Sequence, residues 1–166
     1  EGLCTMYVQR EANESARGLR IGVAVAQYHS DITDALREAA VEVFTKAGGA
    51  NDDLIIIAVP GSFELPPACQ ALANRDDVDA VIAVGCIIRG ETTHDQHIAQ
   101  AVSQALMQIT LDTGKPVAFG VLTCQTKHQA RERAGGESGN KGAEAMASAI
   151  ETVAALRRLA AIRERR

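Results

Sequence analysis

The chain has 166 residues, of which 46% are hydrophobic and 23% are charged, and its formal net charge is −4. This length and composition fit one globular domain with a full core and exclude a disordered chain. The negative charge and the 3% content of aromatic residues argue against a general binder of nucleic acids or of membrane surfaces, because such proteins are basic or present stacking platforms.

Residues 1–18 are polar and aperiodic, which is typical of a flexible N-terminal arm, and residues 19–166 form the single predicted domain. In chain order, the patterns of that domain predict a strand at 19–27, a helix ending at Gly48, a strand at 53–60, a helix to about residue 74, a strand at 78–86, a helix over about 94–112, a strand at 116–123 and two helices at about 126–134 and 140–164.

The predicted strands are continuous apolar runs such as LRIGVAVAQ and DLIIIAVP rather than alternating ones. Such runs indicate strands that are buried on both faces, as in a parallel sheet covered by helices. The fold class is therefore α/β, with three layers and four parallel strands. We expect Ser30 or Asp31 to cap the first helix and the GGESGN stretch to separate the last two helices.

Ligands of parallel sheets bind beyond the carboxyl ends of the strands. Four polar segments follow the predicted strands, at residues 28–30, 61–64, 86–94 and 123–124. Because these ends meet at one edge of the sheet, we expect one candidate site to be built from them.

The stretch GETTH (90–94) lies where a strand leads into a helix. Free N–H groups and the Thr92 hydroxyl there could hold an anion, although a plain helix cap by Thr93 is the commoner arrangement and is favoured on local sequence. His94 could transfer protons near neutral pH, or it could simply be an exposed histidine of the first turn. His94 and His97 lack a third ligand, so no metal site is expected.

Other polar residues of these segments also have two interpretations. Arg89 could meet an anion, but an ion pair with a carboxylate is favoured. Arg133 and Lys141, in ARERAGGESGNKG, could bind phosphate, or they could be solvated charges of a helix–helix turn. Glu64 could hold the hydroxyls of a sugar-like ligand or stabilise its own helix, and Tyr28 could stack on a flat heterocycle or be a packing residue.

The four cysteines, at positions 4, 69, 86 and 124, are widely spaced and form no CxxC pair, which favours reduced thiols in a cytoplasmic protein. No apolar run reaches the length of a membrane span and no signal peptide is recognisable, so we expect cytoplasmic localisation and no membrane partner.

The motifs VPGSFELP, VIAVGCIIRGETTH, PVAFGVLT and QARERAGGESGNKG, in this order, resemble those of the lumazine synthase family over about residues 19–158. The resemblance implies a flavodoxin-like fold. It also implies the penultimate step of riboflavin biosynthesis, in which a ribitylamino-substituted aminopyrimidinedione condenses with 3,4-dihydroxy-2-butanone 4-phosphate to 6,7-dimethyl-8-ribityllumazine. No cofactor or metal is implied.

The resemblance also implies roles for individual residues. It places Tyr28 against the pyrimidine, Ser62, Phe63 and Glu64 along the ribityl chain and ring, and Ile87 and Ile88 along the heterocycle. It assigns Glu91 and Thr92 to the phosphate side, Arg133 to the phosphate itself, His94 to proton transfer, and Phe119 and Lys141 to closure of the site. In the family, Phe119, Arg133 and Lys141 come from the neighbouring subunit.

The chain departs from the family in two places, Gln27-Tyr28-His29 instead of the common RFN, and Asp95-Gln96-His97 where an aromatic usually follows the histidine. The family forms pentamers, and some members assemble into sixty-subunit icosahedral shells. The short GGESGN turn favours the shell, with riboflavin synthase as a candidate partner. The alternatives are a non-catalytic flavin- or lumazine-binding or shell-forming paralogue and a flavodoxin-like electron carrier.

Overall fold

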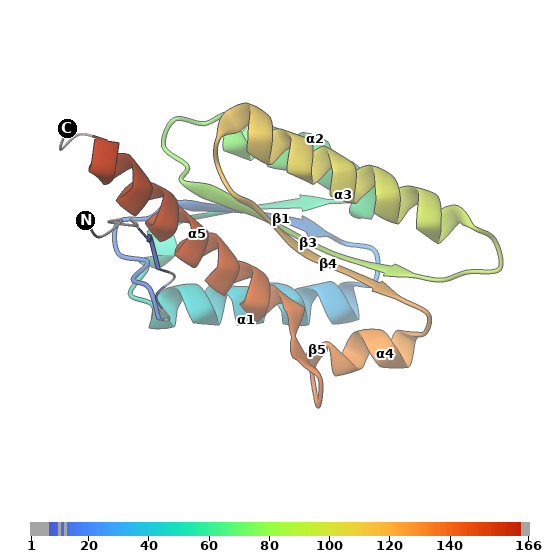
Figure 1. The fold of residues 1–166 in the computed structure, drawn as a ribbon. Helices are drawn as coiled ribbons and strands as arrows, with labels where there is room; N and C mark the ends of the chain where they lie inside the picture. Colours follow the sequence, from blue (N-terminus) through green and yellow to red (C-terminus); the bar gives the residue numbers. More distant parts are fainter. Residues whose placement is uncertain (1–6, 10, 12, 164–166) are drawn as a thin grey trace, which may run out of the picture.

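The computed structural model describes residues 7–9, 11 and 13–163 and has the predicted three-layer α/β architecture (Figure 1). The strands are β1 (Ile21–Ala26), β2 (Leu54–Val59), β3 (Ala80–Ile88) and β4 (Val117–Cys124), with a small hairpin of β5 (Ala134–Gly136) and β6 (Gly139–Asn140). The helices are α1 (Ser30–Lys46), α2 (Leu65–Ala73), α3 (His94–Thr113), α4 (Lys127–Glu132) and α5 (Lys141–Arg163), with short 3₁₀ turns η1 (Asn51–Asp53) and η2 (Ser62–Glu64).

The four long strands form one parallel sheet in the order β2-β1-β3-β4. The chain runs outward from β1 to β2 and then crosses back to place β3 on the other side of β1. The direction of winding therefore reverses between β1 and β3, which is the flavodoxin-like arrangement.

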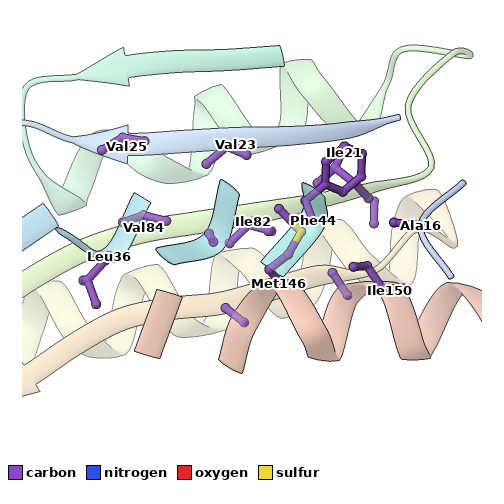
Figure 2. Packing of buried hydrophobic residues seen from close by; sticks show 14 of the residues in the cluster. Ala16, Ile21, Val23, Val25, Leu36, Phe44, Ile82, Val84, Met146 and Ile150 are labelled. Atoms are coloured by element: carbon purple, nitrogen blue, oxygen red, sulfur yellow. The ribbon is translucent and has the colours of Figure 1, made fainter. Parts of the chain in front are cut away.

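One face of the sheet is covered by α1, α4 and α5, and the other by α2 and α3, as Figure 1 shows. On the first face, Phe44 of α1 and Met146 of α5 are fully buried against Ile21, Val23 and Ile82 of the strands (Figure 2). On the second face, residues of α2 and α3 such as Leu65, Leu72, Val102 and Leu106 complete the core. The non-alternating runs of β1 and β3 follow from this double coverage, because both of their faces are buried.

The prediction that residues 53–60 form a buried strand is wrong for the single chain. β2 lies at the edge of the sheet, and Ile56 and Ile57 are 47% and 41% exposed. The run is apolar on both faces, but β1 is its one neighbouring strand in the described sheet, and only Leu54, Ile55 and Val59 pack partly against the cores. The strand therefore presents an apolar edge to solvent.

The helix after β1 starts differently from the expectation. His29 precedes α1 in the left-handed conformation, with φ 62° and ψ 48°, and no side chain caps the helix, so neither Ser30 nor Asp31 does so. The backbone carbonyl of His29 instead accepts hydrogen bonds from the amides of Ile32 and Thr33, at 2.9 and 3.0 Å. Asp31 forms ion pairs with two cations of α4.

The GGESGN stretch does separate two helices, as predicted, but it folds as the β5–β6 hairpin. The Oδ1 atom of Asn140 accepts hydrogen bonds from the amides of Gly142 and Ala143, so this residue caps α5. Its Nδ2 atom donates to the carbonyl of Ala35, which connects α5 to α1. A Cβ atom on Gly142 would lie 1.9 Å from the carbonyl oxygen of Leu36. The glycine therefore allows α5 to cross α1 closely.

The predicted flexible arm at 1–18 falls partly outside the described residues. In its described part, Ala16 is fully buried in the core on the face that α1, α4 and α5 cover. Its amide donates a hydrogen bond to the carbonyl of Ala47 at 2.9 Å. Glu14 pairs with Arg158 of α5. The division into an arm and a domain stays a prediction. Among the described helices, none combines the length and apolarity that crossing a membrane requires.

Candidate active site

A cavity of about 440 Å³ lies at the carboxyl end of the sheet, where the winding direction reverses. Its walls are the turn after β1, the Gly61–Glu64 segment after β2, and the end of β3 with the first turn of α3. Eight residues expected from the sequence line it, namely Tyr28, Ser62, Phe63, Glu64, Ile87, Ile88, Thr92 and His94. A reversal of winding leaves room between adjacent crossover connections, which is why ligands bind at this place in parallel sheets.

The first wall is the turn that joins β1 to α1. The amide of Tyr28 donates to the carbonyl of Pro60 at 3.0 Å, which fixes this turn against the segment after β2. The Tyr28 side chain is 69% exposed at the mouth of the cavity, and so it is available to a ligand rather than committed to the core.

The second wall contains a buried hydroxyl without a partner. Ser62 is 8% exposed, and its Oγ makes no hydrogen bond within the described residues. A Cβ atom on Gly85 would lie 2.7 Å from this Oγ, so the glycine in β3 makes room for the serine. A buried hydroxyl loses free energy when it is unpaired, and a polar group of a bound ligand would restore the lost bond.

The third wall starts at the loop before α3. Thr93 precedes the helix, but its side chain makes no capping hydrogen bond, so the favoured cap prediction is wrong. The hydroxyl of Thr92 instead accepts from the amide of His94 at 3.4 Å. His94 begins the helix with an exposed side chain on the cavity wall. The geometry can supply helix amides and a hydroxyl to an anion beside a histidine.

Arg89 and Asp95 lie beside this wall. Arg89 is exposed and has no carboxylate partner in the described part of the chain, contrary to the favoured ion pair. Asp95 lines the cavity, and its Oδ1 is buried without a hydrogen bond from any described residue. Both side chains also line a smaller hollow of about 240 Å³ next to the cavity.

Four expected residues do not line the main cavity. Glu91 is exposed in the loop before α3, and Phe119 is 37% exposed in the middle of β4, opposite Ala83. Arg133 follows α4 and lines a separate cavity of about 440 Å³. Lys141 begins α5, where its Nζ lies 2.9 Å from a carboxylate oxygen of Glu144. Within a single chain, Phe119, Arg133 and Lys141 therefore lie off the cavity that His94 lines.

Residues that sequence reasoning had not assigned to the site also line the main cavity, namely His29, Gly61, Cys86, Gly90, Asp95 and Ile98. Four of these fall within the segments already identified at the strand ends, and Asp95 directly follows one of them. Which side chains turn inward, however, depends on the turn conformations.

The thiols are not activated. Burial is the main cause that raises the pKa of Cys86 to about 12, and burial alone does the same for Cys69. Cys69, Cys86 and Cys124 are free cysteines, and Cys4 lies outside the described residues. At neutral pH these thiols are protonated, which removes them as nucleophiles. Across the described residues, no group of three histidine, cysteine, aspartate or glutamate side chains is arranged to hold a metal ion.

Comparison with known proteins gives a consistent result. The family model of 6,7-dimethyl-8-ribityllumazine synthase matches residues 18–157. The 6,7-dimethyl-8-ribityllumazine synthase of Thermus thermophilus is 48% identical over 139 residues, which cover 84% of this chain and 88% of the relative. Those of Aquifex aeolicus and Porphyromonas gingivalis are each 45% identical over 141 residues, covering 85% of this chain and 92% and 88% of the relatives.

Proposed function

The chain belongs to the 6,7-dimethyl-8-ribityllumazine synthase family, and from this premise we propose that the cavity at the carboxyl end of its sheet holds the reacting substrates. The protein is an enzyme of riboflavin biosynthesis, a transferase that condenses 5-amino-6-(D-ribitylamino)pyrimidine-2,4-dione with 3,4-dihydroxy-2-butanone 4-phosphate. The observation that carries the proposal is that eight expected residues from three separate segments line this one cavity.

The pyrimidine substrate is assigned to the first two walls. The exposed Tyr28 ring offers a stacking surface for the flat heterocycle, and Ile87 and Ile88 give it an apolar side. The ribityl chain lies along Ser62, Phe63 and Glu64. The unpartnered Oγ of Ser62 and the carboxylate of Glu64 suit a chain of hydroxyls, because each can accept a hydrogen bond from it.

The phosphate substrate is assigned to the third wall. The first amides of α3 and the Thr92 hydroxyl hold its phosphate, with Glu91 in the same loop, and Arg133 supplies a bidentate contact. As the 5-amino nitrogen bonds to the ketone carbon, its two protons pass to the oxygen that leaves as water. A proton then leaves the neighbouring hydroxyl-bearing carbon, and the phosphate leaves with the electrons of its C–O bond. The carbonyl formed in this way is attacked by the ribitylamino nitrogen, which closes the ring, and its oxygen leaves as a second water. His94 transfers these protons. The amine belongs to the substrate, so no lysine imine is needed.

The positions of the other site residues support a site that is shared between subunits. Phe119, Arg133 and Lys141 lie off the cavity that His94 lines. We therefore assign the Phe119, Arg133 and Lys141 that complete each site to a neighbouring copy. The exposed apolar residues Ile56 and Ile57 at the β2 edge, and Met107 and Leu111 on α3, are surfaces that such a copy would cover.

The assembly we propose is a pentamer, with the sixty-subunit icosahedral shell as the final state and the cytoplasm as the location. Riboflavin synthase, which would consume the product, is the proposed partner. Sedimentation of the purified protein tests the assembly, since a particle of monomer or dimer mass would exclude both forms. Co-purification with riboflavin synthase tests the partner.

The activity is tested by incubating the protein with both substrates. We expect fluorescent 6,7-dimethyl-8-ribityllumazine to appear together with one inorganic phosphate for each molecule formed. Binding of the pyrimidine without release of phosphate would instead indicate a paralogue that has kept the pocket and lost turnover. Omitting either substrate is the matched control.

A further inference from the structure

His29 combines features that the proposed reaction does not use. It lines the main cavity, and it has φ 62°, a conformation that residues other than glycine adopt rarely. Hydrogen bonds from the amides of Ile32 and Thr33 to its carbonyl hold it there. This conformation is unfavourable for a residue with a Cβ atom, and residues in such conformations are concentrated at functional sites, so a role for the His29 side chain is expected.

The imidazole of His29 contacts the ring of Tyr28. The two ring centroids are 4.5 Å apart and the planes meet at 62°, an edge-to-face geometry. This is the one contact between rings in the part of the chain that the structure describes. Tyr28 is 69% exposed, so little else restrains its ring.

The surroundings favour the neutral form of His29. Burial, and next the positive charge of Lys127, lower the pKa of His29 below its usual 6.5, while Asp31 opposes them. Asp31 is itself engaged by Lys127 at 3.0 Å and by Arg131 at 3.4 Å. The other titratable groups on the cavity walls are Tyr28, Glu64, Cys86, His94 and Asp95.

We propose that His29 is a positioning residue that holds the Tyr28 ring in place for the flat pyrimidine substrate and that does so in its neutral form. This rests on the proposed function, because it is the pyrimidine that Tyr28 receives there. A heterocycle stacked on Tyr28 also displaces water from the adjacent imidazole.

The dependence on pH has a definite sign. Loss of water disfavours the charged imidazole still further in the complex, so the bound state favours neutral His29 more than the free state does. Affinity for the pyrimidine is then at its full value above pH 6.5, and it falls as the pH drops below this value through the lowered pKa of His29.

Two variants separate the ring from its charge. Asparagine tolerates the left-handed conformation but has no ring, so His29→Asn should raise the dissociation constant of the pyrimidine alone about three- to tenfold at pH 7.5, the range expected for an aromatic pair. The Michaelis constant of the phosphate substrate should stay unchanged. His29→Phe keeps a ring and cannot titrate. It should bind nearly as the wild type does at pH 7.5 and lose the weakening that the wild type shows as the pH is lowered from 6.5.

Titration calorimetry with the pyrimidine substrate measures these constants, with His97→Asn as the matched control. His97 is exposed in the first turn of α3 and does not line the cavity, so this variant should bind like the wild type. Wild-type affinity in His29→Asn would overturn the positioning role, and an unchanged pH dependence in His29→Phe would overturn the role of the neutral form. A wild type that binds the pyrimidine but makes no lumazine would refute the proposed function. The dissociation constants of the His29 variants would then still test the positioning role.

Discussion

The two ends of the parallel sheet differ in how most of their polar groups are paired. At the amino end, the charged residues that precede the strands pair with one another or with Arg157 of α5. Arg20 lies 3.2 Å from Asp53 and 2.8 Å from Asp77, which also binds Arg75, and Asp79 pairs with Arg157. At the carboxyl end, the atoms Ser62 Oγ and Asp95 Oδ1 are buried without partners, and His29 has a strained backbone.

This contrast indicates that the amino end of the sheet contributes mainly to stability and the carboxyl end mainly to function. Unpaired buried groups and strained residues lower the stability of a fold, so they persist where a ligand makes use of them. At the other end most charges are paired within the chain, although Arg158, which pairs with Glu14, has a buried Nε without a hydrogen-bond partner among the described residues. Substitutions at the carboxyl end should therefore change activity more than stability, and those at the amino end the reverse.

The largest effect should come from His94→Ala. Removing the proton-transfer group should lower kcat by about 10²- to 10⁴-fold without abolishing turnover, because the positioning of the two substrates remains. The urea midpoint should not move, since the side chain is exposed. Steady-state assays and urea unfolding check the two halves of this prediction. A wild-type kcat would contradict the proton-transfer role and show that His94 is simply an exposed histidine of the first helical turn.

Arg133→Ala should be next in size. Loss of a charged hydrogen-bonded contact worth about 1.5–3 kcal/mol should raise the Michaelis constant of the phosphate substrate about ten- to a hundredfold, with little change for the pyrimidine. Arg131→Ala is a useful control, because this neighbouring arginine pairs with Asp31 and does not line the cavity of Arg133.

Mixing the two impaired variants tests whether the site is shared. Co-refolded His94→Ala and Arg133→Ala subunits should regain activity above either parent, because some interfaces of a mixed pentamer keep both native residues. Mixed oligomers with no more activity than the two parent variants would contradict a shared site. Mass spectrometry of the intact assemblies confirms that mixing has occurred.

Gly85→Ala should be an exception to this contrast, because it lies at the carboxyl end but should change stability as well as binding. The new methyl group would lie 2.7 Å from Ser62 Oγ and 3.0 Å from Leu65 Cδ1, so both the core and the second wall must shift. We expect a loss of about 1–3 kcal/mol in the free energy of unfolding, together with weaker binding of the pyrimidine. Unfolding by urea and calorimetry measure the two effects. A stable variant with unchanged binding would show that the serine rotates away freely.

The smallest effect should come from Asp77→Asn at the amino end. Arg75 and then Arg20 lower the pKa of Asp77 from 3.8 to about 2, so the charged carboxylate contributes stability above pH 3.8 and loses it as the pH falls toward 2. The variant should have a slightly lower urea midpoint at pH 7 and full activity. The difference from the wild type should shrink below pH 3.8, and a constant difference would mean that charge is not its cause.

Much of the fold and the position of the site could be read from the chain alone. Continuous apolar runs predicted the four strands, and helical spacing with Gly48, Gly49 and Gly114 predicted where the first and third helices end. These signals are local, because side-chain periodicity and the freedom of glycine act over a few residues. Since parallel strands end at a common edge, the polar segments that follow them also predicted where the cavity would lie.

The tertiary structure alone decided which side chains use that edge. β2 reads like β1 but is partly exposed, because its place at the edge of the sheet and not its sequence determines its cover. The turn conformations place His29 and Asp95 on the cavity wall. They also leave α1 and α3 without the side-chain caps expected from Ser30, Asp31 and Thr93. Arg133 and His94 line different cavities for the same kind of reason. Distances between residues far apart in the chain are determined by how the helices pack on the sheet, which no local pattern encodes.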